Sequence, residues 1–422
     1  MDKRTVAIAH VYVFARTSQA VDRGIFLDDN EDMPTVEQNL QVWAEGLEAE
    51  AMRQARRTAR LPIVGGHVAL MPDAHVGLGA TIGSVVPTEG AVIPACVGVD
   101  IGCGMAAVLT DLDASDLPGD LRPLLRRIEQ SIPAGVGRGH EWGAHSPGAK
   151  RASAWLEKNR PRTRLDNRLQ KKSRDQMGTL GAGNHFVEIS LDEQDRVWAV
   201  LHSGSRGIGN LLAQSHISEA KAVAKRLRLQ LEDPDLSYLL EGTPEFEAYL
   251  GDLLFAQAYA RTNRETMLDA LLAALFGFVG KGSEVDRVNC HHNYTAQERH
   301  FGKLLWITRK GAISAKQGEA GIIPGSMGTD TYLVVGKGNP DSYTSSAHGA
   351  GRRMSRTKAR KTLTASSLTR AMEGRTWLGS KASRLVDEHP EAYKDIEEVM
   401  RLSADLVEIK HRLRAILNYK GT

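Results

Sequence analysis

Cysteine is scarce in this sequence, and its scarcity excludes one class of protein. The 422 residues contain three cysteines, Cys96, Cys103 and Cys290. So small and odd a number cannot form a disulfide framework, and we therefore expect a reducing compartment, the cytoplasm. In that setting a single cysteine with chemistry around it serves as a metal ligand or a nucleophile.

Long apolar runs and an excess of one charge are also missing. No segment reaches the roughly 18 apolar residues that a membrane-spanning helix needs, and the apolar stretch near the N-terminus, residues 6–15, is broken by His10 and lacks a signal-peptide pattern. Lysine and arginine total 54 against 51 for aspartate and glutamate, a net charge of +3. We therefore expect no membrane association, and any site for a polyanion must come from local clustering.

Hydrophobic residues make up 41% of the chain, enough for a large core. Strand and helix patterns are mixed without a regular alternation and several segments are dense in glycine, which predicts an α+β fold with one large, loop-rich core domain. We expect an N-terminal segment at 1–37 and the core domain at 38–422. The patterns predict strands within 65–105 and at 197–203, 304–313 and 331–335, and helices at 38–60, 116–132, 211–230, 244–279 and 392–417.

The glycine-flanked run DIGCG places Asp100 and Cys103 three residues apart. A tight turn at this spacing can direct a carboxylate and a thiolate at one cation, and a thiolate can bridge two metals. A lone cysteine is more often a small buried residue in a turn, so this run leaves both interpretations open.

Three histidines stand in similar surroundings. His185 lies in GAGNHFVE and His202 in HSGSRG, at the end of a predicted strand, where each can be a ligand or a hydrogen-bonded structural residue. In CHHNY, adjacent side chains on a strand point to opposite faces, so only one of His291 and His292 can reach a given metal. With Asp100 and Cys103, the histidines at 185, 202 and 292 make five ligands, more than one tetrahedral ion needs, and the mixed set leaves Zn, Mn, Fe and Co open.

Two further segments favour phosphate chemistry. The loop PGSMGT, 324–329, can offer backbone amides and hydroxyls to phosphate oxygens, although an ordinary turn has the same composition. In SSAHGAGRRMSR, small residues leave space beside His348, and six lysines and arginines lie between 352 and 361. An imidazole there can be a ligand, base or nucleophile, and the cations can hold phosphates.

A second basic segment, 150–174, carries ten lysines and arginines against two acids. It is either a solvated helix or a surface that faces a polyanion, and the sequence favours neither.

The segments above resemble, in this order, the RtcB family of RNA-splicing ligases, and the spacing is most similar to the bacterial branch. The matching runs are MPDAHVGLGATIGSVVPTEGAVIPACVGVDIGCGM (71–105), LGAGNHFVEI (180–189), LHSGSRGIGN (201–210), NCHHNY (289–294), TRKGAISA (308–315), GIIPGSMGT (321–329), AHGAGRRMSRTKAR (347–360) and YKG (419–421). The likeness begins near Gln38.

The resemblance implies a function. Members of the family join an RNA 3′-phosphate or 2′,3′-cyclic phosphate end to a 5′-hydroxyl end with GTP and Mn²⁺. A histidine is guanylylated, GMP passes to the RNA 3′-phosphate to give an RNA(3′)pp(5′)G intermediate, and the 5′-hydroxyl displaces GMP. The expected partners are such RNA ends and GTP, the expected state is a monomer, and an accessory activator is left open.

The resemblance also assigns residues. His348 matches the guanylylated histidine; Asp100, Cys103 and His185 match the ligands of one manganese ion, and Cys103, His202 and His292 those of a second. The guanosine-nucleotide site matches Asn184, His185, Phe186, Val187, Glu188, His292, Asn293, Pro324, Gly325, Ser326, Met327, Thr331, His348, Gly349, Ala350, Gly351 and Lys420. Glu188 suits the donor edge of guanine; Arg206, Lys310 and Arg352 suit phosphate or RNA contacts, and the role of Asp73 is open.

Two departures are small. Thr331 stands where the family usually has serine, and Ala347 stands where cysteine is common, and neither removes reactive chemistry. Two other functions fit the same residues: a di-metal phosphoesterase or nuclease acting on RNA ends, which needs no covalent nucleotide, and a nucleic-acid-binding protein with structural metals. Neither uses His348, the Gly-Ser loop and Lys420 together.

Overall fold

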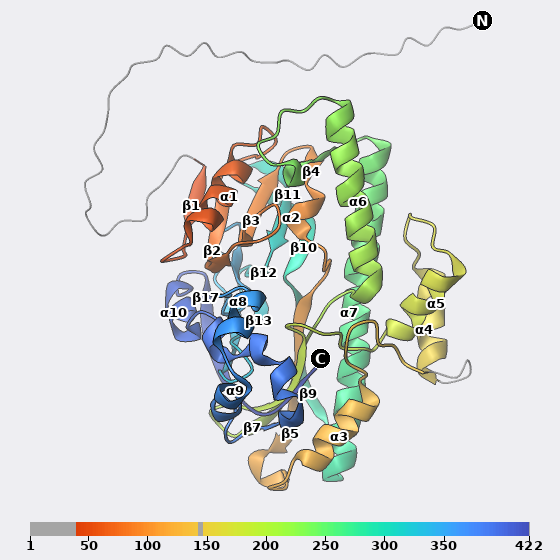
Figure 1. Ribbon diagram of the computed structural model, residues 1–422, viewed down its shortest axis with the longest axis vertical. Helices are drawn as coiled ribbons and strands as arrows, with labels where there is room; N and C mark the ends of the chain where they lie inside the picture. The colour runs from red at the N-terminus through yellow and green to blue at the C-terminus, as the bar shows by residue number, and fades with distance from the viewer. Residues whose placement is uncertain (1–38, 142–146, 422) are drawn as a thin grey trace, which may run out of the picture. The chain divides into compact units, whose positions relative to one another are not determined.

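Two large β-sheets form the framework of the protein (Figure 1). A five-stranded sheet has the order β1 (Leu40–Val42), β2 (Val68–His75), β3 (Ile82–Thr88), β11 (Lys303–Lys310) and β10 (Asn293–His300). An eight-stranded sheet has the order β13 (Ala320–Pro324), β14 (Thr331–Gly336), β17 (Val407–Lys420), β6 (Phe186–Leu191), β7 (Arg196–Ser203), β5 (Gly104–Asp113) and β9 (Glu284–His291), with β16 (Thr376–Trp377) pairing β17. Two small sheets pair β12 (Ala312–Ser314) with β15 (Ser345–Ala347) and β4 (Ala91–Val92) with β8 (Leu239–Leu240).

The computed structural model describes residues 39–141 and 147–421. These residues belong to one compact unit, which runs from Thr35 to Thr422. The expected N-terminal segment 1–37 lies outside the described residues. Among the described strand pairs only β1–β2 and β16–β17 are parallel, so the mixture of helix and largely antiparallel sheet is of the α+β type.

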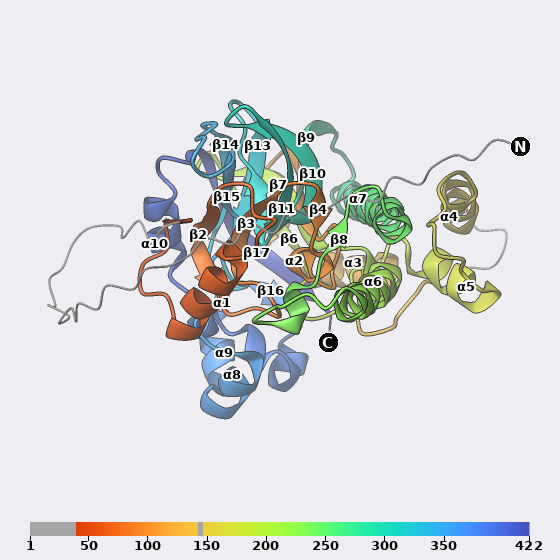
Figure 2. The ribbon, with the colours of Figure 1, turned by 90° about the horizontal axis from the view of Figure 1, so that it is seen from above.

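The helices cover the sheets rather than alternate with their strands (Figure 2). They are α1 (Ala49–Ala59), α2 (Pro94–Val97), α3 (Arg122–Ser131), α4 (Pro147–Lys158), α5 (Asn167–Gln176), α6 (Arg206–Arg226), α7 (Pro244–Val279), α8 (Arg356–Thr362), α9 (Ala365–Ala371) and α10 (Ile396–Leu402). None of the described helices combines the length and the apolar character that crossing a membrane requires.

Helix α7 spans 36 residues and packs against one face of the eight-stranded sheet, on strands β5, β7 and β9. Thr243 caps its first turn by accepting a hydrogen bond from the backbone N–H of Phe246, and Gly280, with φ 85°, ends it in the left-handed conformation that glycine adopts without strain. Leu268, Leu271 and Leu275 on its inner face are fully buried against the sheet. Burial of each such side chain stabilises the fold by about 1.5–3 kcal/mol.

Several elements predicted from sequence are confirmed. The helix at 244–279 has the predicted bounds, and the strands at 197–203 and 331–335 lie within β7 and β14. The predicted strand 304–313 is divided into β11 and β12 at Gly311, whose φ of +64° breaks the extended backbone.

The helix predicted at 392–417 is wrong for most of its length. Only Ile396–Leu402 is helical, and the chain from Val407 onward is strand β17. From the charged run KHRLR onward, buried and exposed side chains alternate as in a strand: Leu413, Ala415 and Leu417 are buried, whereas Arg414 is exposed. Pairing with β14 on one side and β6 on the other decides the outcome, since tertiary context overrides local helix propensity.

Candidate active site

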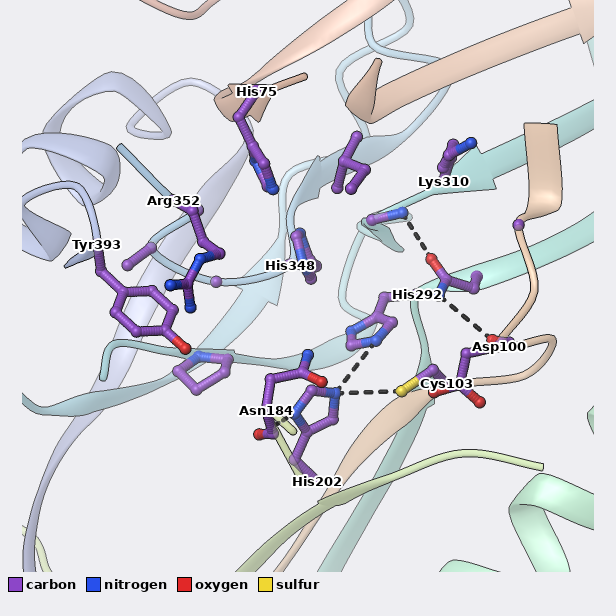
Figure 3. Close-up of a pocket in the computed structure, with 18 of the residues that line it drawn as sticks. His75, Asp100, Cys103, Asn184, His202, His292, Lys310, His348, Arg352 and Tyr393 are labelled. Atoms are coloured by element: carbon purple, nitrogen blue, oxygen red, sulfur yellow. Dashed lines mark hydrogen bonds between the residues drawn. The ribbon is translucent and has the colours of Figure 1, made fainter. Parts of the chain in front are cut away.

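The two large sheets meet around a cavity of about 380 Å³ (Figure 3). Most of the residues predicted from sequence line it: Asp100, Cys103, Asn184, Phe186, His202, His292, Asn293, Pro324, Gly325, Ser326, Met327, His348, Gly349, Ala350, Gly351 and Lys420. Side chains that are far apart in the sequence therefore come together as one site.

Four predicted residues do not line this cavity, and one of them, His185, is buried in the cluster described below. Val187 is fully buried in the core between the eight-stranded sheet and α7. Thr331 is buried at the start of β14, opposite Pro324. Glu188 is buried beside Asn418, whose side-chain N–H donates to Glu188 Oε1 at 2.7 Å. These three lie behind the wall formed by their neighbours.

The turn between α2 and β5 holds Asp100 and Cys103. The backbone N–H of Cys103 donates to Asp100 O at 3.1 Å, which closes the turn. Gly102 has φ +73°, and a Cβ there would lie 2.9 Å from the backbone of Gln257 on α7. A Cβ at Gly204 would lie 2.1 Å from Asp100 Oδ1. Both glycines are therefore required by the close approach of other groups.

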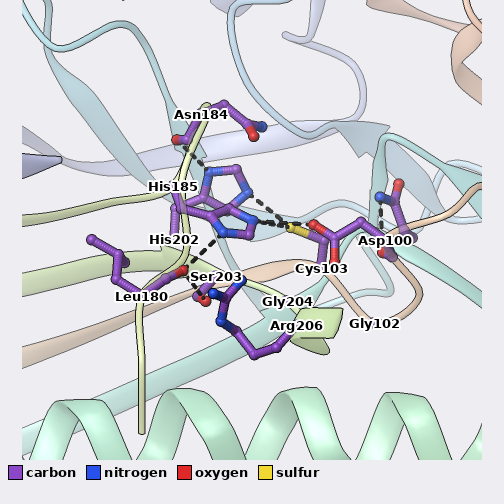
Figure 4. Close-up of polar contacts among 12 residues, drawn as sticks. Asp100, Gly102, Cys103, Leu180, Asn184, His185, His202, Ser203, Gly204 and Arg206 are labelled. Atoms are coloured by element: carbon purple, nitrogen blue, oxygen red, sulfur yellow. Dashed lines mark hydrogen bonds and ion pairs between the residues drawn. The ribbon is translucent and has the colours of Figure 1, made fainter. Parts of the chain in front are cut away.

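Three imidazoles converge on this turn, those of His185 and His202 (Figure 4) and that of His292 (Figure 3). Cys103 Sγ lies 3.3 Å from His185 Nε2 and 3.2 Å from His202 Nε2. Asp100 Oδ2 lies 3.1 Å from His185 Nε2, and His292 Nε2 lies 3.3 Å from His202 Nε2. The predicted five ligands therefore form one continuous cluster.

Backbone carbonyls orient two of the rings. His185 Nδ1 lies 2.9 Å from Leu180 O and His202 Nδ1 lies 3.2 Å from Asn184 O, so each Nδ1–H donates to a carbonyl. The Nε2 of each ring then presents a lone pair to the cluster, as in most metal-binding histidines.

Adjacent His291 and His292 point in opposite directions, as predicted. His292 Nε2 joins the cluster, whereas His291 Nδ1 lies 2.9 Å from Gly102 O and 3.1 Å from Arg264 Nη2. Arg264, fully buried on α7, also donates to Gly102 O at 2.8 Å and Ser203 O at 3.0 Å. It fastens the segments that carry Cys103, His202 and His292, a role that no local pattern in the sequence reveals.

Burial determines the charge states of the cluster. It lowers the pKa of His202 and His292 well below the ordinary value and raises the pKa of the Cys103 thiol well above it. Burial would also raise the pKa of Asp100, but hydrogen bonding and the charge of His185 outweigh it and hold that pKa at about 2. The cluster thus gathers the neutral imidazoles of His202 and His292, an ionised carboxylate and a buried sulfur.

These residues fit a metal centre. Cys103, His185 and His202 offer ligand atoms that all lie within 4.8 Å of one another, and all three side chains are buried. Atoms bound to one first-row cation at about 2.0–2.3 Å lie about 3–3.6 Å apart, which matches the Sγ–Nε2 and Oδ2–Nε2 spacings of the cluster. Facing lone pairs repel unless a cation or a proton lies between them, so the donor set suits a bound metal ion.

His348 adjoins the cluster across the pocket. Its ring centroid lies 4.7 Å from that of His292, with the rings nearly perpendicular. Its Nδ1 lies 2.6 Å from Asp73 Oδ2, and the same carboxylate oxygen accepts the backbone N–H of His348 at 3.1 Å. Asp73 is fully buried, and this contact fixes the orientation of the His348 ring. Asp73, whose role the sequence left open, therefore has a positioning role.

The Gly-Ser loop lies directly against the His348 segment. The backbone N–H of Ala350 donates to Pro324 O at 2.9 Å, and a Cβ at Gly349 would lie 3.0 Å from the same oxygen. The loop is closed by Thr329, whose hydroxyl accepts the backbone N–H of Ser326 at 2.6 Å. The two glycine-rich runs thus form one wall of the pocket.

A buried carboxylate organises the cations at the opposite end of the pocket. Lys420 Nζ lies 2.7 Å from Glu388 Oε2 and 5.4 Å from the centroid of the Phe186 ring. Glu388 also pairs with Arg356 and accepts the hydroxyl of Tyr393 at 2.8 Å. Glu388 and Tyr393 line the pocket and were not found from sequence, because isolated residues at 388 and 393 carry no motif. Arg356 also lines it and belongs to the basic run that the sequence analysis found after His348.

Three cations expected at phosphate or RNA contacts occupy different places. Lys310 lines the pocket and donates to Leu78 O at 2.5 Å and Ala95 O at 2.7 Å, and burial lowers its pKa to about 8. Arg352 lines the pocket with its guanidinium 4.7 Å from the ring centroid of Tyr393. Arg206 is half-buried beside the cluster (Figure 4) and donates to the Thr179 hydroxyl at 3.1 Å.

His75 is a further pocket residue that sequence reasoning missed. It lies at the end of β2 and lines the cavity, and its Nδ1 is 3.0 Å from Asp73 O. Burial lowers its pKa to about 4, so the ring is neutral at physiological pH. It stands in the MPDAH run, where its alternation with Asp73 along the strand was the available signal.

Comparison with known proteins gives the family of the chain. A family model described as "tRNA-splicing ligase RtcB" matches residues 54–421. The chain is 43% identical over 410 residues to the RNA-splicing ligase RtcB of Escherichia coli strain K12, covering 90% of this chain and 97% of that protein. It is 30% identical over 443 residues to the tRNA-splicing ligase RtcB of Nanoarchaeum equitans, covering 89% of this chain and 92% of that protein.

The fold and the site define a class of protein: an α+β protein with a buried cysteine–histidine cluster beside a glycine-lined pocket. The chain belongs to the RtcB family of RNA-splicing ligases, and its higher identity to the Escherichia coli protein than to the archaeal one places it with the bacterial members. It is accordingly an enzyme of the ligase class.

Proposed function

We propose that this chain is a GTP- and manganese-dependent RNA ligase. It joins RNA 3′-phosphate or 2′,3′-cyclic phosphate ends to 5′-hydroxyl ends, in RNA repair or tRNA splicing in the cytoplasm. The names of the relatives, RNA-splicing and tRNA-splicing ligase, support the substrate class. The placement of His348 carries the proposal.

His348 has the geometry of a nucleophile. With Nδ1 held 2.6 Å from Asp73 Oδ2, the lone pair of Nε2 is available to the pocket. Nε2 attacks the α-phosphorus of GTP, an N–P bond forms, and the bond to the α,β-bridging oxygen breaks as pyrophosphate leaves. An oxygen of the RNA 3′-phosphate then attacks the same phosphorus and the N–P bond breaks, which gives RNA(3′)pp(5′)G. Attack by the 5′-hydroxyl on the 3′-phosphorus releases GMP, and its proton passes to solvent.

The cluster residues would hold two manganese ions. Asp100, Cys103 and His185 would bind one and Cys103, His202 and His292 the other, so that the Cys103 thiolate is shared. The bound ions would neutralise charge on the phosphates and orient them for in-line displacement. The 4.7 Å between the rings of His292 and His348 supports this, because it places the nucleophile next to the ligands.

The rest of the pocket would bind the guanosine nucleotide. Glu188 lies behind the pocket wall in the free protein, and it would accept from N1–H and the 2-amino group of guanine when the bound base displaces the Asn418 side-chain N–H from its Oε1. Lys420 and Phe186 would flank the base. The loop at Ser326 and the segment from His348 to Gly351 would offer backbone N–H groups to the phosphates. The other predicted nucleotide-site residues would support this wall, namely Asn184, His185, Val187, His292, Asn293 and Thr331.

Ligation of a 3′-phosphate RNA to a 5′-hydroxyl RNA tests the proposed function. We expect joined product only with GTP, and most of it with Mn²⁺ when Mn²⁺, Mg²⁺, Co²⁺ and Zn²⁺ are compared at equal concentration. Gel separation of end-labelled RNA reports both joining and cleavage. Cleavage of RNA without GTP, and without any joined product, would instead support the di-metal phosphoesterase or nuclease.

Affinity for GTP is expected to fall as the pH drops below about 7. Burial raises the pKa of Glu188 to about 7. Asn418, Lys420 and Arg375 lower this pKa, and the charge of Asp330 raises it. Only the ionised carboxylate offers both oxygens to guanine, so protonation in the free protein competes with binding. From about pH 8 to about pH 6 we expect about a tenfold loss of affinity, measured as the Kd for a fluorescent GTP analogue.

The Glu188→Gln variant is the control for this pH dependence. Its binding should be weaker at high pH and nearly independent of pH, apart from the titration of the phosphates that both proteins share. Equal pH dependence in the parent and the variant would remove Glu188 from guanine recognition.

A further inference from the structure

The basic segment 150–174 has no part in the pocket, and the structure gives it a definite form. It comprises most of α4, the loop 159–166 and most of α5, and α5 packs on α6 (Figure 1). A second cavity, of about 690 Å³, opens between the loop and the two helices. Five cations line it, namely Arg160, Arg162, Arg164, Lys171 and Arg174, against one acid, Glu157.

The arginines of the loop are exposed and available for a ligand. Among the residues that the structure describes, Arg160, Arg162 and Arg164 form no ion pair, whereas Lys171 and Arg174 both contact Asp175, at 2.6 Å and 3.2 Å. Exposed guanidinium groups without a partner repel one another, so a cluster of this kind favours a bound polyanion.

A buried carboxylate fixes the loop that carries them. Asp252, on α7, is fully buried and accepts the backbone N–H of Thr163 at 3.0 Å and its hydroxyl at 2.6 Å. His216 Nε2, on α6, lies 2.7 Å from Oδ2 of the same carboxylate. Gly251 leaves room for the stem of Arg162, because a Cβ there would lie 2.4 Å from Arg162 Cγ.

Fixing the loop lowers the cost of binding. A flexible arginine loop would lose backbone entropy when a ligand bound, and this one has already lost it. The hydrogen bonds between Asp252 and Thr163 fix the backbone of the loop and leave the guanidinium groups of the neighbouring arginines in solvent. A merely solvated basic surface needs no such buried support.

The surface is also connected to the active site. Gln176, the last residue of α5, accepts the backbone N–H of Gly207 at 3.1 Å beside the turn that follows His202. The chain then runs from α5 through residues 177–183 to Asn184 and His185. The basic segment 150–174 is therefore connected to segments that carry metal-cluster residues in two ways, by this hydrogen bond and by the chain itself.

We infer that loop 159–166, with the facing sides of α4 and α5, is a docking surface for the sugar–phosphate backbone of the RNA substrate, away from the end being joined. The inference rests on the proposed function, which supplies a polyanion whose reactive end lies in the pocket. Planar guanidinium groups bind phosphates bidentately and read no base, so the surface binds RNA without regard to sequence.

Charge reversal on the loop tests the inference. In Arg160→Glu/Arg164→Glu, we expect a long single-stranded 3′-phosphate RNA to bind at least about tenfold more weakly, by fluorescence anisotropy. The slope of log affinity against log salt should flatten by about 0.7 for each RNA phosphate that the variant no longer neutralises. A 3′-phosphate trinucleotide, which has only two internal phosphates to extend from the pocket, should bind as to the parent, and formation of the covalent GMP adduct should be unchanged.

Two further variants make the outcome decisive. Lys225→Glu/Arg228→Glu makes the same charge change on two exposed residues, one in the last turn of α6 and one two residues beyond its end, about 30 Å along the helix direction from Gly207. This variant should leave long-RNA binding within about twofold. Arg160→Gln/Arg164→Gln removes the charges without adding acids and should show a smaller loss.

Equal losses in the loop and control variants, or a loss shared by the trinucleotide, would overturn the inference. Absence of the GMP adduct in the parent protein would instead count against the proposed function. Tighter binding of anionic vesicles than of RNA by the loop would also overturn the inference.

Discussion

Incubated with labelled GTP and Mn²⁺, the parent protein is expected to carry a covalent GMP, and His348→Ala is expected to carry none. The variant removes the only imidazole in the described pocket whose Nδ1 is held by a buried carboxylate, that of Asp73. Loss of a nucleophile costs at least about 10⁴-fold in rate when no neighbouring group replaces it. Denaturing gel electrophoresis followed by peptide mass mapping locates the adduct.

Asp73→Asn should resemble the histidine variant without abolishing the reaction. An amide keeps the shape of the carboxylate but loses its charge, and it can present a donor to Nδ1, so the ring adopts the tautomer that lacks a lone pair on Nε2. We expect adduct formation to slow by about 10²–10⁴-fold with little change in the Kd for GTP, a separation that a general loss of folding would not give.

His67→Ala is the matched control. His67 is partly exposed and its Nε2 lies 2.6 Å from Asp341 O, outside the pocket. Its replacement should leave adduct formation at the parental rate. A parental yield of adduct in His348→Ala would assign the nucleophile elsewhere.

Cys103→Ala is expected to remove both metal ions at once. Cys103 Sγ is the only atom of the described cluster within 3.3 Å of both His185 and His202, so its loss opens both proposed coordination shells. We expect the manganese content, measured by inductively coupled plasma mass spectrometry after dialysis, to fall to background. The adduct should be lost with it.

Cys103→Ser and Cys96→Ala define this prediction further. A serine hydroxyl does not ionise as a thiol does and is a poor ligand, so Cys103→Ser should bind metal far more weakly than the parent. Cys96 is equally buried but packs in the core beneath the five-stranded sheet, and Cys96→Ala should keep its manganese. Parental metal content in Cys103→Ala would exclude the shared-thiolate arrangement.

The parts of this site that the sequence revealed are those with local signatures. Asp100 and Cys103 stand in one short glycine turn, and His348 is marked by the small residues beside it, so these residues could be singled out before the fold was known, while their roles came from the resemblance to the RtcB family. The alternation of a strand predicted that only one of His291 and His292 can reach the cluster, and the resemblance to the RtcB family indicated His292.

The parts that the sequence did not reveal act across long distances in the chain. Arg264 contacts the metal turn from the middle of a helix, and Glu388 gathers Lys420 and Arg356 from a segment without a motif. Asp73 could be seen in its run, but its hold on His348 depends on the packing of β2 against the segment after β15. Such interactions depend on tertiary packing, which local pattern does not encode.

Strand β17 has a consequence for the dimensions of the pocket. It is the only partner that joins β14, which leads from the Gly-Ser loop, to β6, which follows Asn184 and His185, among the strands that the structure describes. Its register, which includes an irregularity on each side, therefore sets how far the loop stands from the metal cluster. Strand β17, which carries Lys420, thus also sets the distance between the Gly-Ser loop and the metal cluster. A shift of its register by one residue would change the width of the pocket and turn Lys420 to the other face of the sheet.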